Sequence, residues 1–263
     1  MFIGQNKILK ELDIMVEVAR ENKDFSINIL FQAPSGYGKT TLGLKFGNAI
    51  SNKFIEGKFV TSGFQYMLGD INALNPTNRV LFIDEVHLLE IPEEIYPLMD
   101  SEEHIFILAT NEFAGLKKPL VNRCIKFQFE KYSDDDLINI ARNNLRIYSE
   151  VPDDFYTEII KGGKKNPREI IVLCRRLNIL LRKYPIENKE DLIKVLSEII
   201  NIKGGLDYNS RMYLEVLGKI NIGSLKTISN MLGLQETAIK YEIEPYLLYL
   251  GKIKITSRGR ELI

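Results

Sequence analysis

The chain has 263 residues, 45% of them hydrophobic and 27% charged, and its 35 basic and 35 acidic side chains give zero net charge. Zero net charge excludes the strongly basic nucleic-acid-binding proteins, so any nucleic-acid surface has to be a local patch. No apolar stretch approaches the ~20 residues that cross a bilayer, and the polar start is not typical of a signal peptide. Two widely spaced cysteines indicate buried thiols in a reducing compartment. We therefore expect a cytoplasmic globular protein of two or three units, with no membrane segment.

Short apolar runs alternate with helical patterns over the first half of the chain. Such alternation predicts a parallel sheet covered by helices on both faces, and hence an α/β unit over residues 1–132. A helix is expected at 38–50 and a shorter one at 93–99. The expected strands are 27–33, 58–62, 79–85, 104–111 and, as a weaker candidate, 124–129.

After Tyr132 the pattern becomes helical. The segment SDDDLINIARNNL opens with a serine cap and an acidic first turn, followed by apolar residues at helical spacing. Residues 133–203 are therefore expected to form an all-helical unit, and the glycines of IKGGL at 202–206 indicate a linker. The further helices expected in this unit are 153–161, 167–182 and 189–200.

Residues 204–263 contain three helical patterns and a short strand at 252–256. Two of the helical patterns resemble a helix-turn-helix with Gly233 at the turn. The segment 203–263 carries nine Lys/Arg and six Asp/Glu, a local charge of 9 − 6 = +3. Because Arg258 and Arg260 flank a glycine beyond the strand, this end of the chain suits contact with DNA phosphates. A solvated charged turn is the alternative interpretation.

The stretch FQAPSGYGKTTLG, at 31–43, departs from the phosphate-loop pattern G-x-x-x-x-G-K-[ST] only at Ala33. It lies between a buried strand and the start of a helix, where backbone N–H groups and the helix dipole favour phosphate. Lys39 is expected to reach the β- and γ-phosphates of ATP, and Thr40 to bind Mg²⁺. Ala33 is expected at the strand end with a negative φ, so the missing glycine does not exclude nucleotide binding. A chance run of small residues is the alternative.

Two further polar positions follow predicted strands. RVLFIDE ends in Asp84 and Glu85, which are placed to hold Mg²⁺ through water and to activate the attacking water, respectively. Asn111, after the strand ILAT, is placed to orient the same water. The alternatives are an acidic helix cap for the first pair and a turn-forming role for the asparagine.

Two arginines complete the set. Arg123, in PLVNRC, lies too far along the chain to serve its own phosphate easily, so we expect it to enter a neighbouring subunit's site as a finger. Arg168, in KNPRE, begins a helix of the all-helical unit, from which it is expected to touch the γ-phosphate. Surface salt bridges are the alternative for both residues.

Taken in order, these segments resemble AAA+ ATPases, and among them the RuvB family of Holliday-junction branch-migration motors. FIGQ, APSGYGKTTL, LFIDEVHLL, ATN, PLVNRC and NPREI follow the family's order, and LDYNSRMYLEVL with IEPYLLYLGKIKITSRGR resembles its winged-helix domain. The last match is the most specific, since many AAA+ proteins share the ATPase motifs. The resemblance implies an AAA+ P-loop domain with a parallel sheet at 1–132, an all-α lid at 133–203 and a winged-helix DNA-binding domain at 204–263.

The resemblance also implies site residues, with ATP and Mg²⁺ as cofactors. The implied catalytic residues are Lys39, Asp84, Glu85, Asn111, Arg123 and Arg168, and the implied metal ligands are Thr40 and Asp84. The residues implied to hold the nucleotide are Phe2, Ile3, Pro34, Ser35, Gly36, Tyr37, Gly38, Lys39, Thr40, Thr41, Tyr132, Pro167 and Arg168. In the family a TxRGR segment touches the DNA backbone, which implies contacts from Thr256, Arg258 and Arg260.

The chain departs from the family between its second and third motifs. Family members carry a β-hairpin between the DE strand and the Asn strand and use it to bind RuvA, whereas only residues 86–103 separate those strands here. We expect the hairpin to be absent, which argues against dependence on RuvA and leaves room for another protein partner. Val121 replaces a family arginine, and NRC resembles the SRC motif of clamp loaders. The sequence indicates a compact, divergent member of the kind that a phage or mobile element encodes.

Two main functions remain open at this point. The first is a homo-oligomeric ring or spiral, expected to be a hexamer, that hydrolyses ATP between subunits to move double-stranded or branched DNA. The second is a loader or switch that acts on a clamp, a helicase or a protein complex without processive translocation. The winged-helix resemblance favours the first, and the missing hairpin favours the second. A nucleotide-binding scaffold without turnover is a third, motivated only by Ala33.

Overall fold

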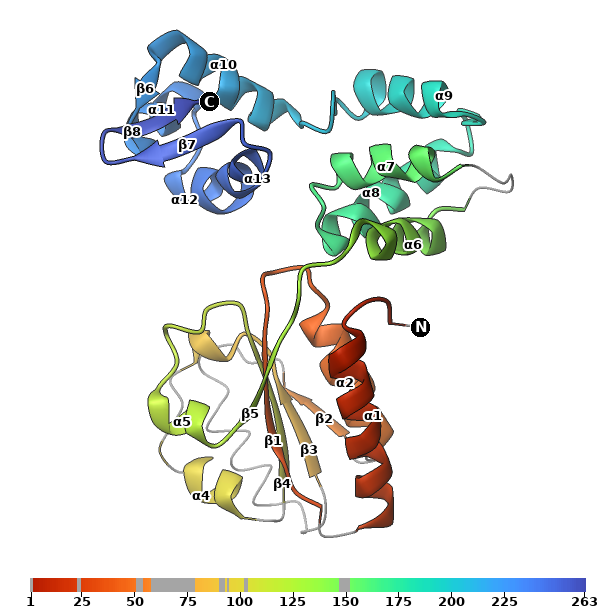
Figure 1. Cartoon of the computed structure of the whole chain (residues 1–263), viewed down its shortest axis with the longest axis vertical. Coiled ribbons are helices and arrows are strands. Elements are labelled where there is room, and N and C mark those ends of the chain that lie inside the picture. Colours follow the sequence, from red (N-terminus) through yellow and green to blue (C-terminus); the bar gives the residue numbers. More distant parts are fainter. Residues whose placement is uncertain are drawn as a thin grey trace. The chain divides into compact units, whose positions relative to one another are not determined.

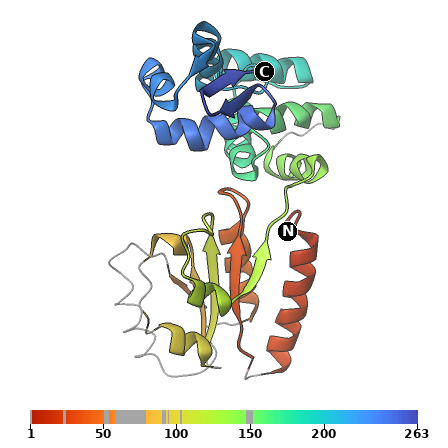
Figure 2. The ribbon, with the colours of Figure 1, turned by 60° about the vertical axis from the view of Figure 1, so that its left-hand side comes forward.

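The computed structural model describes residues 2–22, 25–50, 54–57, 79–89, 93, 95–101, 104–146 and 152–263. The chain divides into two compact units, Met1–Asp136 and Leu137–Ile263, which Figures 1 and 2 show from two directions. Within the described ranges, no helix combines the length and the apolar character needed to span a membrane.

A five-stranded sheet in the order β2-β3-β4-β1-β5 forms the centre of the first unit. All four strand pairs are parallel, which confirms the predicted sheet. The strand predicted at 58–62 lies outside the described residues, and β2 lies just before it. The strands are β1 (Asn28–Gln32), β2 (Phe54–Gly57), β3 (Arg79–Ile83), β4 (His104–Thr110) and β5 (Ile125–Gln128).

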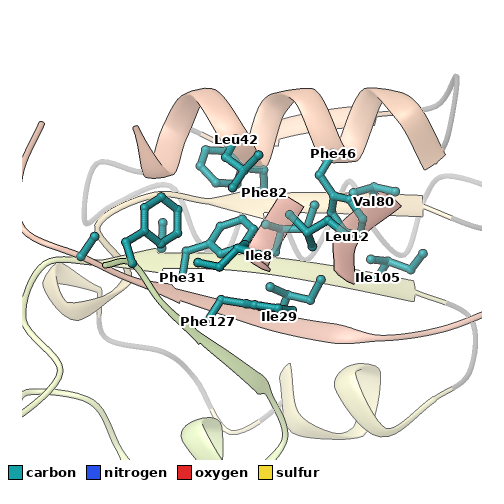
Figure 3. Packing of buried hydrophobic residues seen from close by; sticks show 14 of the residues in the cluster. Ile8, Leu12, Ile29, Phe31, Leu42, Phe46, Val80, Phe82, Ile105 and Phe127 are labelled. Atoms are coloured by element: carbon teal, nitrogen blue, oxygen red, sulfur yellow. The ribbon is translucent and has the colours of Figure 1, made fainter. Parts of the chain in front are cut away.

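Helices cover both faces of this sheet (Figures 1 and 2). Alternate residues of a strand point to opposite faces: Ile29 and Phe31 pack in one hydrophobic cluster with α1 and α2, and Leu30 packs in the other with α4 and α5. Figure 3 shows the first cluster. The helices are α1 (Asn6–Glu21), α2 (Lys39–Ile50), α4 (Ile95–Asp100) and α5 (Lys118–Asn122).

The connection between β3 and β4 is short. Its described residues form a 3₁₀ turn, η1 (Val86–Leu88), and the helix α4, and they contain no β-strand. The expectation that no hairpin is inserted there stays a prediction, since residues 90–92, 94 and 102–103 lie outside the described residues.

A glycine lets α2 approach β3 closely. A Cβ atom at Gly43 of α2 would lie 2.4 Å from the ring of Phe82 in β3. Phe82 is only 1% exposed and is packed in the cluster of Figure 3, so its ring cannot move aside without disturbing that cluster. The absence of a side chain at Gly43 therefore sets the distance between the helix that follows the phosphate loop and the strand that precedes Asp84.

The second unit begins with four helices and a π-turn. The elements from α7 to η2 match the helices expected at 153–161, 167–182 and 189–200. The predicted domain boundary at 203/204 stays a prediction. The elements are α6 (Asp134–Asn144, which spans the boundary of the units), α7 (Asp153–Gly162), α8 (Pro167–Leu180), α9 (Lys189–Lys194) and η2 (Val195–Ile199).

A winged helix follows. Gly233 ends α11 with a left-handed φ of 67°, as expected of the residue at the turn of a helix-turn-helix. A three-stranded antiparallel sheet in the order β6-β8-β7 closes the fold. The wing, defined here as β7 and β8, has a second strand that the sequence pattern did not predict. The elements are α10 (Tyr208–Ile220), β6 (Ile222–Gly223), α11 (Leu225–Leu232), α12 (Glu236–Ala238), η3 (Ile239–Ile243), α13 (Glu244–Tyr249), β7 (Ile253–Thr256) and β8 (Gly259–Leu262).

The close approach of α2 to β3 predicts a specific cost at Gly43. Gly43→Ala is expected to lower the free energy of unfolding of the first unit by about 1–3 kcal/mol, because overpacking exceeds the gain in helix propensity. Gly218→Ala in α10 is the control, since its Cβ would lie an ordinary 3.7 Å from Leu262. Thermal unfolding followed by circular dichroism checks both variants. Equal stability of the Gly43 variant and the unchanged chain would contradict the packing argument.

Candidate nucleotide-binding site

The phosphate loop, residues 33–38, joins the carboxyl end of β1 to the amino terminus of α2. Gly36 and Gly38 have φ values of 86° and 90°, in the left-handed region that favours glycine. Ala33 is not among the residues of positive φ, and its N–H donates to the carbonyl of Thr110 at 3.2 Å, continuing the ladder between β1 and β4. The alanine therefore occupies a position where the backbone does not require glycine.

Lys39 points back into this loop. Its side chain is buried, and Nζ donates to the carbonyl oxygens of Ala33 at 2.9 Å and Pro34 at 3.3 Å. A buried ammonium held at the concave side of a phosphate loop is close to where phosphate oxygens would bind, and the exchange of carbonyl for phosphate oxygens would keep it satisfied.

Thr40 and Asp84 meet, although 44 positions separate them in the chain. The hydroxyl of Thr40 donates to Asp84 Oδ2, and the other carboxylate oxygen accepts the Glu85 N–H at 2.9 Å. A hydroxyl and a carboxylate are hard oxygen donors, which suit Mg²⁺. Among the described residues no group of three or more His, Cys, Asp or Glu forms a metal cage. This donor set fits an ion that takes one or two protein ligands and binds otherwise to phosphates and water.

Glu85 adopts an unusual backbone conformation beside that pair. Its φ of 49° is left-handed, and within the described ranges its Oε2 is buried without a hydrogen-bond partner. His87 Nδ1 lies 3.5 Å from this oxygen. Strained backbone and an unsatisfied buried oxygen occur preferentially at functional sites, where the rest of the fold holds them. The role of the Glu85 carboxylate as the base that activates water stays a prediction.

His87 connects Glu85 to the neighbouring strand. Its Nδ1 lies 3.1 Å from the hydroxyl of Thr110, which already donates to the carbonyl of Glu112 and accepts that residue's N–H. Since the hydroxyl proton is used, Nδ1 serves best as the donor, which also places an N–H rather than a lone pair toward Glu85. Asn111 follows Thr110 directly and is exposed. The contact of His87 with Thr110 has no signal in the sequence, since 23 positions separate the two residues.

The start of the chain folds against the other side of the loop. The Gln5 side chain exchanges two hydrogen bonds with the backbone of Glu130, at 2.8 and 2.9 Å. Tyr132 then donates to the carbonyl of Tyr37 at 2.9 Å, and burial raises the pKa of Tyr132 to about 12. A Cβ at Gly38 would lie 2.9 Å from the ring of Phe2. The residues predicted to enclose the nucleotide therefore gather around the loop.

Pro167 and Arg168, the remaining predicted nucleotide contacts, belong to the second unit, at the amino terminus of α8. Arg168 N–H donates to Asn166 Oδ1 at 2.9 Å, and its side chain is exposed. The contact of both residues with the nucleotide stays a prediction. The members of the predicted set that lie in the first unit are Phe2, Ile3, Pro34, Ser35, Gly36, Tyr37, Gly38, Lys39, Thr40, Thr41 and Tyr132.

Arg123 lies at the opposite edge of the sheet from the phosphate loop. Arg123 precedes β5, which runs parallel to β1 with Ile29 beside Ile125. The loop follows the far end of β1, so at about 3.3 Å per residue the length of the strand places the Arg123 backbone roughly 15–20 Å from the loop. Its guanidinium donates to both oxygens of Asp100, at 2.8 and 2.9 Å, and lies 4.8 Å from the ring centre of Tyr96. The hydrogen bond from Arg123 lowers the pKa of Asp100 below its usual value. These contacts fix the direction of the guanidinium.

The wing contains the three predicted DNA contacts in two different settings. Arg258 is exposed at the tip, where its N–H donates to Thr256 Oγ1 at 3.3 Å. Arg260 instead faces inward and donates to Glu244 at 2.8 and 3.3 Å. Glu244 is 1% exposed and accepts a further hydrogen bond from Tyr213 at 2.9 Å. Because its guanidinium neutralises a buried carboxylate, Arg260 has a structural role in the winged helix, and its contact with DNA stays a prediction.

Comparison with known proteins agrees with this geometry. The family model described as the Holliday junction DNA helicase RuvB P-loop domain matches residues 1–124, and that of the RuvB C-terminal winged helix domain matches residues 203–263. The Holliday junction branch migration complex subunit RuvB of Campylobacter jejuni strain 81-176 is 30% identical, over 98% of this chain and 86% of that protein. Its Mycoplasma pneumoniae counterpart is 26% identical, over 98% and 92%.

Solved structures give the same result. The structure of the Thermotoga maritima RuvB Holliday junction branch migration motor superimposes with a TM-score of 0.78 at 26% identity and covers 100% of this chain and 93% of that one. The Aeropyrum pernix ORC1 protein in complex with DNA shares the fold at a TM-score of 0.57, with 14% identity over 99% and 88%. On the joint basis of the two family models, the identity to the Campylobacter protein and this structural agreement, the chain belongs to the RuvB family of P-loop ATPases.

Proposed function

We propose that the chain is an ATP-driven motor that moves or remodels branched double-stranded DNA, with ATP hydrolysed between its own subunits. The observation that carries the proposal is the division of the ATPase residues between two edges of one sheet. Lys39, Thr40, Asp84 and Glu85 lie at the loop edge, and Arg123 lies at the other. Membership of the RuvB family supplies the DNA substrate class, since its members are named for Holliday junction branch migration.

The residues at the loop edge suit binding and hydrolysis of ATP. The loop N–H groups and Lys39 would hold the β- and γ-phosphates, and Thr40 and Asp84 would hold Mg²⁺. The ion would neutralise charge that develops on the phosphate oxygens. Glu85 would accept a proton from the attacking water, with Asn111 orienting that water from the end of β4.

Arg123 would complete the site of the next subunit. A residue that is distant from its own phosphate loop can act at a loop only across an interface between two different surfaces, and such head-to-tail interfaces generate rings or spirals. We propose a homo-oligomer of this kind, expected to be a hexamer. Asp100 would hold the guanidinium in its outward direction until a neighbour's phosphate competes for it.

DNA would contact the tip of the wing. Arg258 and Thr256 are placed there, and contacts from such residues to the backbone are independent of sequence, as a translocating protein requires. Because the described residues between β3 and β4 hold no hairpin, we propose that the chain engages its substrate without a RuvA-type partner.

Mixing two inactive variants tests whether the arginine acts across subunits. Glu85→Gln is expected to bind ATP without turnover, and Arg123→Ala to lose at least about 10³-fold in kcat. A 1:1 mixture should regain activity, since about a quarter of its interfaces would combine an intact Glu85 with an intact Arg123. Steady-state ATPase assays check this, with Arg123→Lys as the control that keeps charge without the bidentate fork. No recovery on mixing would contradict action in trans.

The two wing arginines are expected to behave differently. Arg258→Ala should weaken binding to any DNA duplex and reduce the slope of log K against log salt by ~1, without changing stability. Arg260→Met should lower the thermal midpoint, because it leaves the buried Glu244 charge unpaired, and Arg260→Met with Glu244→Gln should recover part of it. Fluorescence anisotropy at several salt concentrations and thermal unfolding check the pair. If Arg260→Met with Glu244→Gln lost more DNA affinity than Arg258→Ala, the structural role proposed for Arg260 would be contradicted.

Strand exchange on a four-way junction tests the motor itself. The purified chain with ATP and Mg²⁺, and no second protein, should convert a labelled synthetic junction into duplex products, and Glu85→Gln should not. Gel separation of the products checks the result. ATPase stimulation by DNA without any product would favour the loader or switch interpretation over the motor.

A further inference from the structure

The turn between α7 and α8 holds two consecutive lysines in a conformation that lysine rarely adopts. Lys164 and Lys165 have φ values of 54° and 52°, both in the left-handed region. Backbone hydrogen bonds nevertheless close the turn: the Lys164 N–H donates to Lys161 O, and the Lys165 N–H to Ile160 O, each at 3.0 Å. Residues kept in such a conformation persist only where surrounding contacts hold them, and they occur preferentially at functional positions.

The contacts that hold the turn come from the winged helix. Lys164 Nζ lies 2.7 Å from Asp207 Oδ2 and donates to the carbonyl of Glu242 at 3.2 Å. Lys165 Nζ lies 5.6 Å from the centre of the Tyr249 ring. The turn therefore contacts the residue that caps α10, the end of η3, and α13.

A further contact of the same kind lies one turn earlier. The Tyr246 hydroxyl of α13 donates to the carbonyl of Lys161 at 3.0 Å, and a Cβ at Gly205 would lie 2.9 Å from Lys161 Cβ. The end of α7 and the turn after it thus form one continuous surface against the winged helix. At 20% exposure the Lys164 side chain is largely shielded from solvent, so its ion pair with Asp207 is less screened than a surface pair.

The same turn also sets the position of Arg168. Asn166 caps α8 by accepting the Arg168 N–H at 2.9 Å, and Pro167 fixes the first helical position. A Cβ at Gly163 would lie 2.8 Å from the backbone of Ile170, so the turn and the first turn of α8 are packed backbone to backbone. Movement of Arg168 therefore moves the turn with it.

We propose that the Lys164–Lys165 turn is the positioning element that couples the nucleotide-contacting start of α8 to the DNA-binding winged helix. The proposal rests on the proposed function as an ATP-driven motor and on the contact of Arg168 with the γ-phosphate that the sequence predicts. Lys164 transmits a shift of Arg168 to α10 through Asp207, and the left-handed backbone directs both lysine side chains at the winged helix. The residues act on hydrolysis only through others, so their contribution is a coupling between two sites.

The test measures coupling rather than activity alone. In a Glu85→Gln background, affinity for a DNA duplex is measured with and without Mg–ATP, and the ratio of the two dissociation constants is the coupling factor. Lys164→Gln and Asp207→Asn should each reduce the factor at least about fivefold, and the double variant should do no more than either alone. Asparagine keeps the cap of α10, so Asp207→Asn removes only the charge. Lys164→Arg should restore the factor.

Two further variants separate coupling from folding. Lys164→Gly removes Nζ but relieves the left-handed backbone, so it should lose coupling without a lower thermal midpoint. Lys189→Gln breaks another ion pair of the second unit, 3.1 Å from Asp154, that joins α9 to α7, so it should leave the coupling factor unchanged. Basal ATPase activity, measured with Glu85 intact and without DNA, should stay within about twofold in all these variants.

The outcomes distinguish this inference from the proposed function. An unchanged coupling factor in Lys164→Gln and Lys164→Gly, with DNA-stimulated ATPase activity intact, would overturn the inference and leave the motor in place. If the Glu85→Gln chain with no further substitution bound ATP and DNA without any coupling between them, both the inference and the proposed function would be overturned. Loss of coupling in the lysine and aspartate variants alone, with restoration by arginine, is the result that the structure leads us to expect.

Discussion

The contact between Thr40 and Asp84 is the constraint on which the rest of the site depends. It joins the first turn of α2 to the end of β3, and the absence of a side chain at Gly43 lets the same helix lie against Phe82 of that strand. The parallel pairing of the strands fixes the rest of the site, since it brings the carboxyl ends of β1, β3 and β4 to one edge of the sheet. The phosphate loop, the acidic pair and Asn111 follow those three ends. An interior packed to crystal-like density leaves no alternative position for α2.

Because the sheet is parallel, Arg123 could act in ATP hydrolysis only in the proposed assembly of several subunits. A residue that precedes a strand and a residue that follows the neighbouring parallel strand cannot meet within one sheet, because the strand length lies between them. Arg123 and the phosphate loop stand in this relation. Its bidentate pairing with Asp100 keeps a delocalised charge oriented, which, in the proposed assembly, would reduce the entropy lost if a neighbouring subunit's phosphate replaced the carboxylate.

Local pattern predicted the parts of the fold and site that depend on neighbours in sequence. The strands around Leu30 and Phe82 and the glycines of the phosphate loop have such signals, because burial and positive φ restrict residue type directly. Contacts between distant segments have none. No signal in the sequence indicated that Arg260 pairs with Glu244, 16 positions away, and β8 was missed because two of its four residues, Arg260 and Glu261, are charged. The contact of His87 with Thr110 likewise depends on sheet order, which periodicity cannot give.

The proposed coupling depends on short-range contacts inside the second unit. In the proposal Arg168 touches the γ-phosphate, so loss of that phosphate on hydrolysis would release the start of α8. The Lys164–Lys165 turn precedes that helix start directly and contacts α10 and η3 of the winged helix through Lys164. A shift of the start of α8 would therefore reach the winged helix through contacts that are already formed.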